Sequence, residues 1–359
     1  MKGLCLAGML ALFGWFRSGA DLYFARWHAD SPALAPDGRH MAFLEESGST
    51  HVEVVIVDCA APDLRSTTQL ALLQPSPGPG LGALAWLDQT HCEVDLPDRT
   101  HWLITAGSDQ AVALGSAGSG LPPAPLEPAE SAIAAKFLER SVTVASWDRT
   151  RQRAVLWVHS PAEAGRYFLY DRPTERLTEF DRRLPSLHWA DLADVQSFQL
   201  PGDRPRTAVY SAPHIRGTHK LPLVLLDRGV EVRPDALEYE PFTQSLCAAG
   251  FAVLEVSSAP DEWHTEREQA QLRALALAFV QFPVDRTRVA VLGVGPGGKW
   301  AQRLAGQHPE IFRCGVALGT GSTADASEAD AGRFFTVPKK YGERAAAATT
   351  ALSYLRQRL

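Results

Sequence analysis

Hydrophobic and polar residues alternate along the first half of the chain in short runs that are typical of β-strands. An Asp-Gly turn lies between two such runs within residues 31–44, and a run rich in β-branched residues covers 51–58. Segments 81–94 and 154–171 repeat this pattern. Residues 21–185 are therefore predicted to form antiparallel hairpins in an all-β domain.

Two segments rich in Gly, Pro, Ser and Ala, residues 75–80 and 114–128, interrupt this pattern and are predicted to be loops or spacers. A β-propeller closes only when several four-stranded blades complete a ring. The 165 residues of the β-rich part suffice for a reduced, propeller-like fold or an open stack of sheets rather than a full ring.

The second half of the chain has a different pattern, in which continuous apolar runs alternate with amphipathic segments. Strands are predicted over 221–226, 251–256, 288–292 and 314–318, and helices over 242–249, 266–279, 299–306 and 343–359. This alternation predicts a doubly wound parallel sheet with helices on both faces, an α/β domain over 205–359. Residues 186–204 are predicted to be a linker.

The first twenty residues have the pattern of a signal peptide. Lys2 precedes an apolar stretch over residues 4–16, and small residues follow at 18–20, where a signal peptidase would cut. The alternative is an uncleaved anchor, but the stretch is shorter than the roughly 20 residues that span a bilayer. We therefore expect cleavage of residues 1–20, export to the periplasm or the medium, and no membrane span in the mature chain.

The composition is that of an ordinary globular protein, with 359 residues of which 45% are hydrophobic and 21% charged. The formal net charge of −6 is spread along the chain. Without a basic block there is no electrostatic reason to expect nucleic acid as a partner.

Cysteine and histidine spacing predicts no metal site. The four cysteines outside the signal segment lack a C-x-x-C spacing, and the histidines at 188, 214 and 219 lack regular spacing. Buried free thiols are the simplest interpretation. Because export permits disulfides, Cys59 and Cys92 are the pair to test first.

The most specific local motif is Gly293-Val294-Gly295-Pro296-Gly297-Gly298, between a predicted strand and a predicted helix. Written G-x-G-x-x-G, it matches a dinucleotide-binding fingerprint. That interpretation requires an acidic residue at the end of the next strand, but no carboxylate follows that strand before Asp325. The motif also follows at least two strands of its domain, whereas the fingerprint usually follows the first.

The same segment resembles the nucleophile elbow, G-x-S-x-G-G, of the prolyl-oligopeptidase and dipeptidyl-peptidase family of serine peptidases. Residues 312–317 are similar to the family's next strand, 221–229 to the strand leading to its His-Gly-Gly loop, and 27–44 to the start of its N-terminal β-propeller. The resemblance covers most of the mature chain, and outside the elbow it is architectural. It implies an α/β-hydrolase domain preceded by a propeller-like part.

The departures from the family pattern fall on the catalytic positions. Gly295 occupies the position of the nucleophilic serine and has no side chain that could attack a carbonyl. Pro296 follows it, where the family's backbone N–H contributes to the oxyanion hole, and proline has no N–H. Asp227-Arg228-Gly229 stands where the family has His-Gly-Gly.

The remaining triad positions are also altered in this comparison. The stretch that corresponds to the family's catalytic histidine is Gly332-Arg333-Phe334-Phe335, which would place Arg333 at the position of the base. Arginine stays protonated and cannot accept a proton. The family's acid-bearing strand is reduced to residues 319–331, where Asp325 and Asp330 are interpreted as solvated charges.

Ser257 and His264, which follow a predicted strand together with Ser258 and Asp261, could form a relocated catalytic pair at the carboxyl edge of the sheet. A serine and a histidine seven residues apart are more often incidental. The tryptophans at 157, 189, 263 and 300 are interpreted as core or interface residues.

Three functions thus remain open. The first is an inactive prolyl-oligopeptidase-like protein that binds a peptide or protein, in the cleft between its two parts or as a subunit of a larger complex or oligomer. The second is an active serine hydrolase using Ser257 and His264. The third is a nucleotide-binding α/β protein using residues 293–298. We expect no cofactor.

Overall fold

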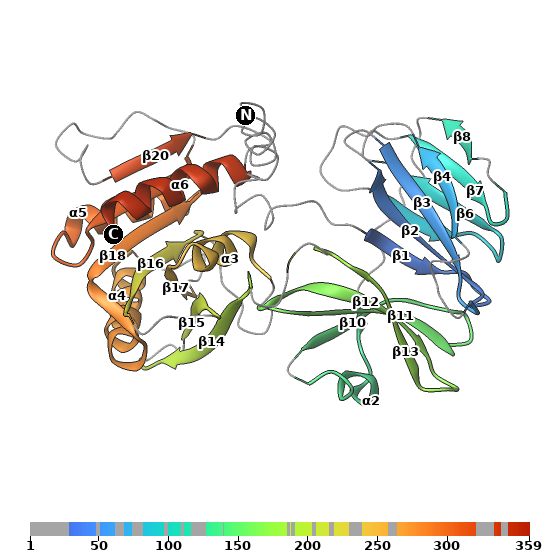
Figure 1. Ribbon diagram of the computed structural model, residues 1–359, viewed down its shortest axis with the longest axis horizontal. Coiled ribbons are helices and arrows are strands. Elements are labelled where there is room, and N and C mark those ends of the chain that lie inside the picture. The colour runs from blue at the N-terminus through green and yellow to red at the C-terminus, as the bar shows by residue number, and fades with distance from the viewer. Residues whose placement is uncertain are drawn as a thin grey trace, which may run out of the picture. The chain divides into compact units, whose positions relative to one another are not determined.

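The computed structural model describes the chain in segments, which form two compact units: residues 26–185, here called the β-sheet unit, and residues 186–359, the α/β unit (Figure 1). The described residues are 29–47, 51–61, 68–73, 82–96, 100–108, 111–115, 127–138, 140–184, 187, 191–202, 206–214, 219–229, 239–257, 264–320, 334–338 and 344–359. The predicted signal peptide lies outside them. No helix among the described residues is both long and apolar enough to cross a membrane.

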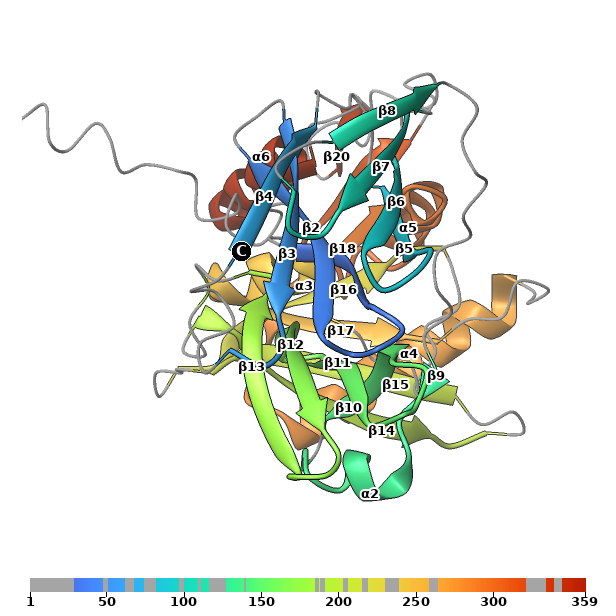
Figure 2. The ribbon, with the colours of Figure 1, turned by 90° about the vertical axis from the view of Figure 1, so that its right-hand side faces the viewer.

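The β-sheet unit contains three antiparallel sheets, and in each the strands are hydrogen-bonded in chain order (Figure 2). The first sheet consists of β1 (Ala29–Leu34), β2 (His40–Ser47), β3 (His51–Asp58) and β4 (Thr68–Leu73). The second consists of β5 (Ala83–Trp86), β6 (His91–Asp95), β7 (His101–Thr105) and β8 (Ala111–Gly115). The third consists of β9 (Glu127–Pro128), β10 (Ser141–Trp147), β11 (Arg153–Ser160), β12 (Glu163–Asp171) and β13 (Arg176–Arg182), with α2 (Ser131–Ala134) between β9 and β10.

The first sheet is buried on both faces because its strands carry apolar residues at successive positions. Since side chains alternate across a strand, Met41 and Phe43 of β2 pack into a core shared with the third sheet, and Ala42 and Leu44 pack into a core shared with the second. The far face of the third sheet packs on Ile133 of α2. The described residues thus form a stack of three sheets, the open alternative to a ring.

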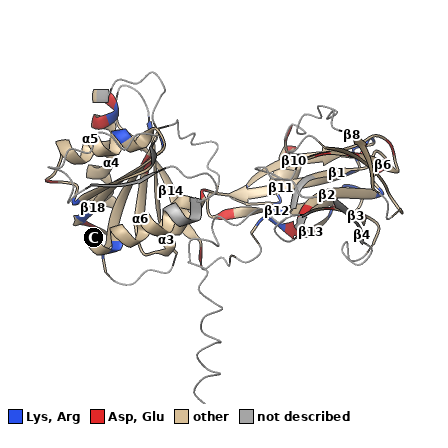
Figure 3. Cartoon of the chain, turned by 90° about the horizontal axis from the view of Figure 1, so that it is seen from above, with Lys and Arg blue, Asp and Glu red and all other residues tan. Residues whose placement is uncertain are grey.

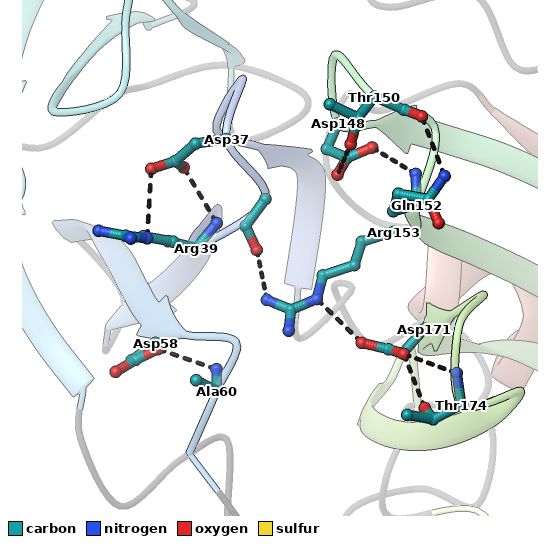
Figure 4. A network of polar contacts seen from close by, with 11 residues as sticks. Asp37, Arg39, Asp58, Ala60, Asp148, Thr150, Gln152, Arg153, Asp171 and Thr174 are labelled. Carbon is teal, nitrogen blue, oxygen red and sulfur yellow. Dashed lines mark hydrogen bonds and ion pairs between the residues drawn. The ribbon is translucent and has the colours of Figure 1, made fainter.

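A polar network joins the first and third sheets at their turns (Figure 4). Arg153 of β11 donates to the carbonyl oxygen of Gly38 in the β1–β2 turn (2.8 Å) and to Asp171 at the end of β12 (3.1 Å). Asp148 closes the β10–β11 turn by accepting from the backbone N–H of Gln152 (2.8 Å). The contact of Arg153 with Gly38 links the two sheets, and the other two contacts hold the turns of the third sheet.

The α/β unit is built on one seven-stranded sheet with the strand order β14-β15-β17-β16-β18-β19-β20. Its strands are β14 (Ala193–Leu200), β15 (Arg206–Pro213), β16 (Leu221–Asp227), β17 (Ala252–Val256), β18 (Val284–Val294), β19 (Cys314–Thr320) and β20 (Phe334–Pro338). β14 and β15 are antiparallel to their neighbours, and the pairs from β17 to β20 are parallel.

Helices cover both faces of this sheet, as the alternation of strands and helices predicts. They are α3 (Pro241–Ala248), α4 (His264–Gln281), α5 (Gly297–Gln307) and α6 (Arg344–Arg358). On one face, alternate residues of the central strands pack against α4 and α5, with Ala274 and Leu304 fully buried. On the other face they pack against α3 and α6, with Leu246 and Leu355 fully buried. The core therefore lies in two layers around the parallel strands.

Two predictions about this unit are corrected by its sheet. Residues 186–204 are not merely a linker, because β14 lies within them and pairs along its whole length with β15. β14 was missed because it is an edge strand whose middle residues are partly or fully exposed, which weakens the apolar signal. β15 was missed although it is buried, because its sequence mixes polar and apolar residues. β20 was missed as well and pairs in parallel with β19.

The suggested disulfide between Cys59 and Cys92 is also corrected. Both thiols are free and buried. Cys59 lies in the core between the first and third sheets, and Cys92 lies in the core between the first and second, so the first sheet separates them. Burial raises the pKa of each thiol to about 12, which disfavours the reactive thiolate.

A pH-dependent contact joins α4 to the end of α5. His308 Nε2 lies 2.8 Å from Glu268 Oε1, and its Nδ1 lies 3.2 Å from Glu310 Oε1. Hydrogen bonding to Glu268 raises the pKa of His308 above its ordinary value of 6.5.

Because the folded-state pKa of His308 is the higher one, its contribution to stability is fully present below pH 6.5 and is lost as the pH rises through the folded-state pKa. We expect the contribution to stay below about 1 kcal/mol, since the pair is partly exposed. Urea titrations of wild type and His308→Gln from acidic to alkaline pH should show a difference that shrinks with rising pH. A constant difference would contradict this assignment.

Candidate functional site

The Gly293–Gly298 motif forms the turn from β18 into α5 at the carboxyl end of the parallel strands. Gly295 has a φ of +56°, the left-handed conformation that favours glycine. Its backbone N–H donates to the carbonyl oxygen of Leu318 (2.7 Å), and its own carbonyl oxygen accepts from the N–H of Gly298 (3.1 Å). These bonds define a tight strand-to-helix turn of the kind that presents a nucleophile in hydrolases.

Three glycines around this turn are required by close backbone packing. A Cβ on Gly293 would lie 2.1 Å from the carbonyl oxygen of Gly297, and a Cβ on Gly297 would lie 2.1 Å from that of Asp227. A Cβ on Gly229 would lie 2.8 Å from the backbone nitrogen of Gly297. The loop after β16 therefore lies directly against the turn after β18. This packing accounts for the glycines without a bound pyrophosphate.

Gly295 is different from these three. No described atom beyond its chain neighbours lies within 4 Å of the position that its Cβ would occupy. With respect to the described residues, a side chain at this position would stand in open space, as the attacking hydroxyl of a nucleophile elbow does. Pro296, the next residue, precedes the first turn of α5 and offers no N–H for an oxyanion.

The loop after β16 is held on one face of the sheet by a buried carboxylate. Asp227 accepts from the backbone N–H of Gly229 (2.8 Å), from Gln271 Nε2 (2.7 Å) and from both Nε (3.1 Å) and a terminal nitrogen of Arg267. Gln271 Oε1 in turn accepts from the indole N–H of Trp300 (2.8 Å). The network links β16, α4 and α5, and it satisfies both oxygens of Asp227.

Arg228, the next residue of the same loop, points to the opposite face. Its guanidinium donates to Glu255 of β17 and lies 3.9 Å from Glu240, the residue that caps α3. Thr243 Oγ1 also donates to Glu255 (2.5 Å). Burial raises the pKa of Glu240. Burial alone would lower the pKa of Arg228, but the neighbouring carboxylates raise it, so the arginine stays charged.

The chemistry available at the turn follows from these contacts. The two charged side chains of the loop are both neutralised by internal partners, and the turn itself carries only glycine, proline and valine. Asp227 is unsuited to act as a base because its oxygens already accept four hydrogen bonds. Within the described residues, no group of three His, Cys, Asp or Glu side chains could hold a metal ion.

Ser257, the proposed relocated nucleophile, has a structural role. Its hydroxyl oxygen accepts from the backbone N–H of Thr207 (3.0 Å), and its own N–H donates to the carbonyl oxygen of Thr207 (2.9 Å). These two bonds extend the pairing of β17 with β15. His264 opens α4, but its side chain, together with Ser258 and Asp261, lies outside the description.

The assignment of Arg333 to the position of the base stays a prediction. Arg333, Asp325 and Asp330 lie outside the described residues. Phe334 and Phe335, which directly follow Arg333, begin β20 and pair with Gly315 and Val316 near the start of β19.

Sequence reasoning missed the Asp227 network. Arg267 and Gln271 are four residues apart and therefore lie on one face of α4. The network could have been predicted from Arg267 and Gln271, a cation and an amide on one side of a helix, together with Asp227, the carboxylate that ends an apolar strand. Trp300, interpreted as a core residue, is buried and belongs to this network.

No protein-family model matches the chain, and no curated protein matches it. Among solved structures, it is similar to one described as a dipeptidyl aminopeptidase IV from Bacteroides ovatus, with 10% identity, a TM-score of 0.45 and coverage of 92% of this chain and 66% of that one. A puromycin-hydrolyzing peptidase of Mycobacterium tuberculosis shows 16% identity, a TM-score of 0.40 and coverage of 82% and 53%. An acylaminoacyl peptidase of Pyrococcus horikoshii shows 10% identity, a TM-score of 0.41 and coverage of 82% and 70%. These similar structures are of serine peptidases of the prolyl-oligopeptidase family.

Proposed function

We propose that this chain is a non-catalytic protein on a serine-hydrolase scaffold that binds a peptide or protein, or supports another subunit. The observation that carries the proposal is the turn at Gly295. It has the left-handed backbone and the open space that a nucleophile requires, but it carries neither a side chain nor, at Pro296, the following N–H. Binding needs only a shaped surface, so it does not depend on these groups.

The contacts around the turn support this proposal. Asp227 and Arg228 are charged side chains beside an enzyme-like turn, yet each is committed to a partner on a packed helix or strand. Figure 3 shows Lys and Arg interspersed with Asp and Glu over the described elements, which favours a partner recognised by shape rather than by strong charge.

The two alternative functions are each opposed by one contact. The hydroxyl oxygen of Ser257 is engaged by Thr207, which speaks against its use as a nucleophile. The glycines of the motif are explained by their approach to Asp227 and to one another, which removes the main reason to expect a nucleotide. We expect no uptake of NAD or ATP in equilibrium dialysis, a result that would remove the third function.

An activity-based fluorophosphonate probe tests the proposal directly. We expect the wild-type protein to remain unlabelled under conditions that fully label an active serine hydrolase, because the turn lacks a hydroxyl. Ser257→Ala serves as a control and should behave as wild type. Covalent labelling of wild type would refute the proposal, and its loss in Ser257→Ala would establish the relocated nucleophile.

Gly295→Ser tests whether the scaffold is only one residue away from activity. We expect the variant to fold with a loss of about 1–2 kcal/mol, the usual cost of a left-handed non-glycine residue. It should stay unlabelled, because among the described residues no side chain is placed beside the turn to act as the base that would activate the serine. Gly229→Ser is the matched control: it has a similar φ of +67° but would clash with Gly297, so it should be the less stable variant. Labelling of Gly295→Ser would mean that a base reaches the turn.

A further inference from the structure

Among the described residues, one short segment of the chain covers the far face of the third sheet. Residues 129–138, here called the α2 strap, contain α2, which packs on β10 (Figure 1). The sheet face beneath the strap is apolar, and its buried residues include Val144, Leu156 and Phe168. Within the strap only Ile133 is buried. A largely exposed segment therefore covers a face that would otherwise meet water.

Few contacts hold the strap to the sheet. Its backbone donates one hydrogen bond to the sheet, from the N–H of Ala129 to the carbonyl oxygen of Val142 (3.1 Å), whereas the N–H groups of residues 133–137 donate within the strap. The Phe137 ring packs edge-on against Phe168, with centroids 5.1 Å apart. α2 has four residues, and its N-cap residue makes no side-chain cap hydrogen bond. Because a helix this short does not persist in water, α2 depends on its contact with the sheet.

Two ion pairs join the strap to the turn between β12 and β13. Glu130 accepts from a terminal nitrogen of Arg172 (2.8 Å), and Lys136 Nζ donates to Glu175 (2.9 Å). The two pairs lie on either side of Ile133 in the sequence, and each has one charge of either sign on the strap. All four side chains are partly or largely exposed, so the pairs are individually weak and are weakened further by salt.

We infer that the α2 strap opens and closes over the third sheet as a unit, while the sheet beneath it stays folded, and that its two ion pairs set how often it opens. The strand pairings from β10 to β13 do not involve the strap. Opening breaks far fewer contacts than unfolding of the sheet, and such local openings are the less costly ones. The strap thus acts as a lid on an apolar face of the β-sheet unit. The inference does not rest on the proposed function.

The reaction rate of a thiol beneath the strap with a water-soluble thiol reagent measures the opening. Val144→Cys places a thiol on the face that the strap covers, and Val155→Cys, the matched control, places one on the opposite buried face of the same sheet. We expect Val144→Cys to react about tenfold or more faster than Val155→Cys under native conditions. Its rate should hardly change at low urea concentrations, because opening of the strap exposes little surface.

Circular dichroism establishes that both cysteine variants fold, and Val142→Cys offers a second position on the covered face. The described native cysteines are all buried, which keeps the background reaction low. Equal rates on the two faces, with the same dependence on urea, would mean that the strap opens only when the whole unit unfolds and would overturn the inference.

Charge substitutions test the role of the ion pairs. In the Val144→Cys background, Lys136→Glu sets a carboxylate opposite Glu175 and should raise the reaction rate about two- to fivefold. Adding Glu175→Lys reverses the pair and should restore the lower rate. Arg182→Glu, which breaks the pair with Glu179 outside the strap, is the matched control and should leave the rate unchanged. A Lys136→Glu rate equal to that of this control would overturn the role of the ion pairs.

Discussion

Gly165→Ala is expected to lower the free energy of unfolding of the β-sheet unit by about 3 kcal/mol or more, because it adds backbone strain to overpacking. Gly165 lies in β12 with a φ of +113°, and a Cβ there would lie 1.7 Å from the Trp157 ring. That ring contacts Tyr167, with centroids 4.7 Å apart, and the Arg183 guanidinium, 3.9 Å from the indole centroid. The indole therefore has little room to move. Urea unfolding followed by circular dichroism measures the loss.

Gly107→Ala provides the matched control for Gly165→Ala. Gly107 has a φ of +81°, but nothing lies within 4 Å of its Cβ position. Only strain should remain, at a cost of about 1 kcal/mol. Shortening the indole with Trp157→Leu in the Gly165→Ala background should recover part of the loss, which a double-mutant cycle detects as coupling. Equal losses for the two glycine variants would mean that the contact with Trp157 is not the cause.

Asp227→Ala should be the most damaging substitution in the α/β unit, with an expected loss of about 3–5 kcal/mol. The variant leaves Arg267, whose side chain is 17% exposed, without its buried counter-charge. It also removes the acceptor of the Gly229 N–H and of Gln271, so the loop after β16 loses its anchor against the Gly295 turn. Thermal and urea unfolding should report the same direction.

Replacing both Asp227 and Arg267 distinguishes two costs: the loss of their attraction, and the burial of a charge that has no partner. Asp227→Leu combined with Arg267→Met should recover much of the stability that Asp227→Ala loses, because no unpaired charge remains buried. Arg288→Ala, which breaks a partly exposed pair with Asp285, should cost about 1 kcal/mol or less. An Asp227→Ala variant as stable as Arg288→Ala would show that the network does not hold the loop.

The elements of the α/β unit follow closely from the sequence because their signals are local. The apolar stripe predicted as a helix over 266–279 is found as α4, His264–Gln281, and the run at 314–318 is found in β19, Cys314–Thr320. Continuous burial of a central parallel strand leaves a continuous apolar run. Edge strands such as β14 leave a mixed pattern, since half of their surroundings is solvent.

The absence of a side chain at Gly295 and of an N–H at Pro296 can be read from the amino-acid sequence alone, because these are covalent properties of the two residues. Which groups meet at the turn depends on the fold. Asp227 and Arg267 are forty residues apart, and Ser257 is fifty residues from the Thr207 N–H that engages its hydroxyl. Such contacts depend on how strands and helices cross in space. The residue types therefore determine which chemical groups the turn lacks. The arrangement of the sheet and its helices determines which partners the charged side chains beside the turn bind.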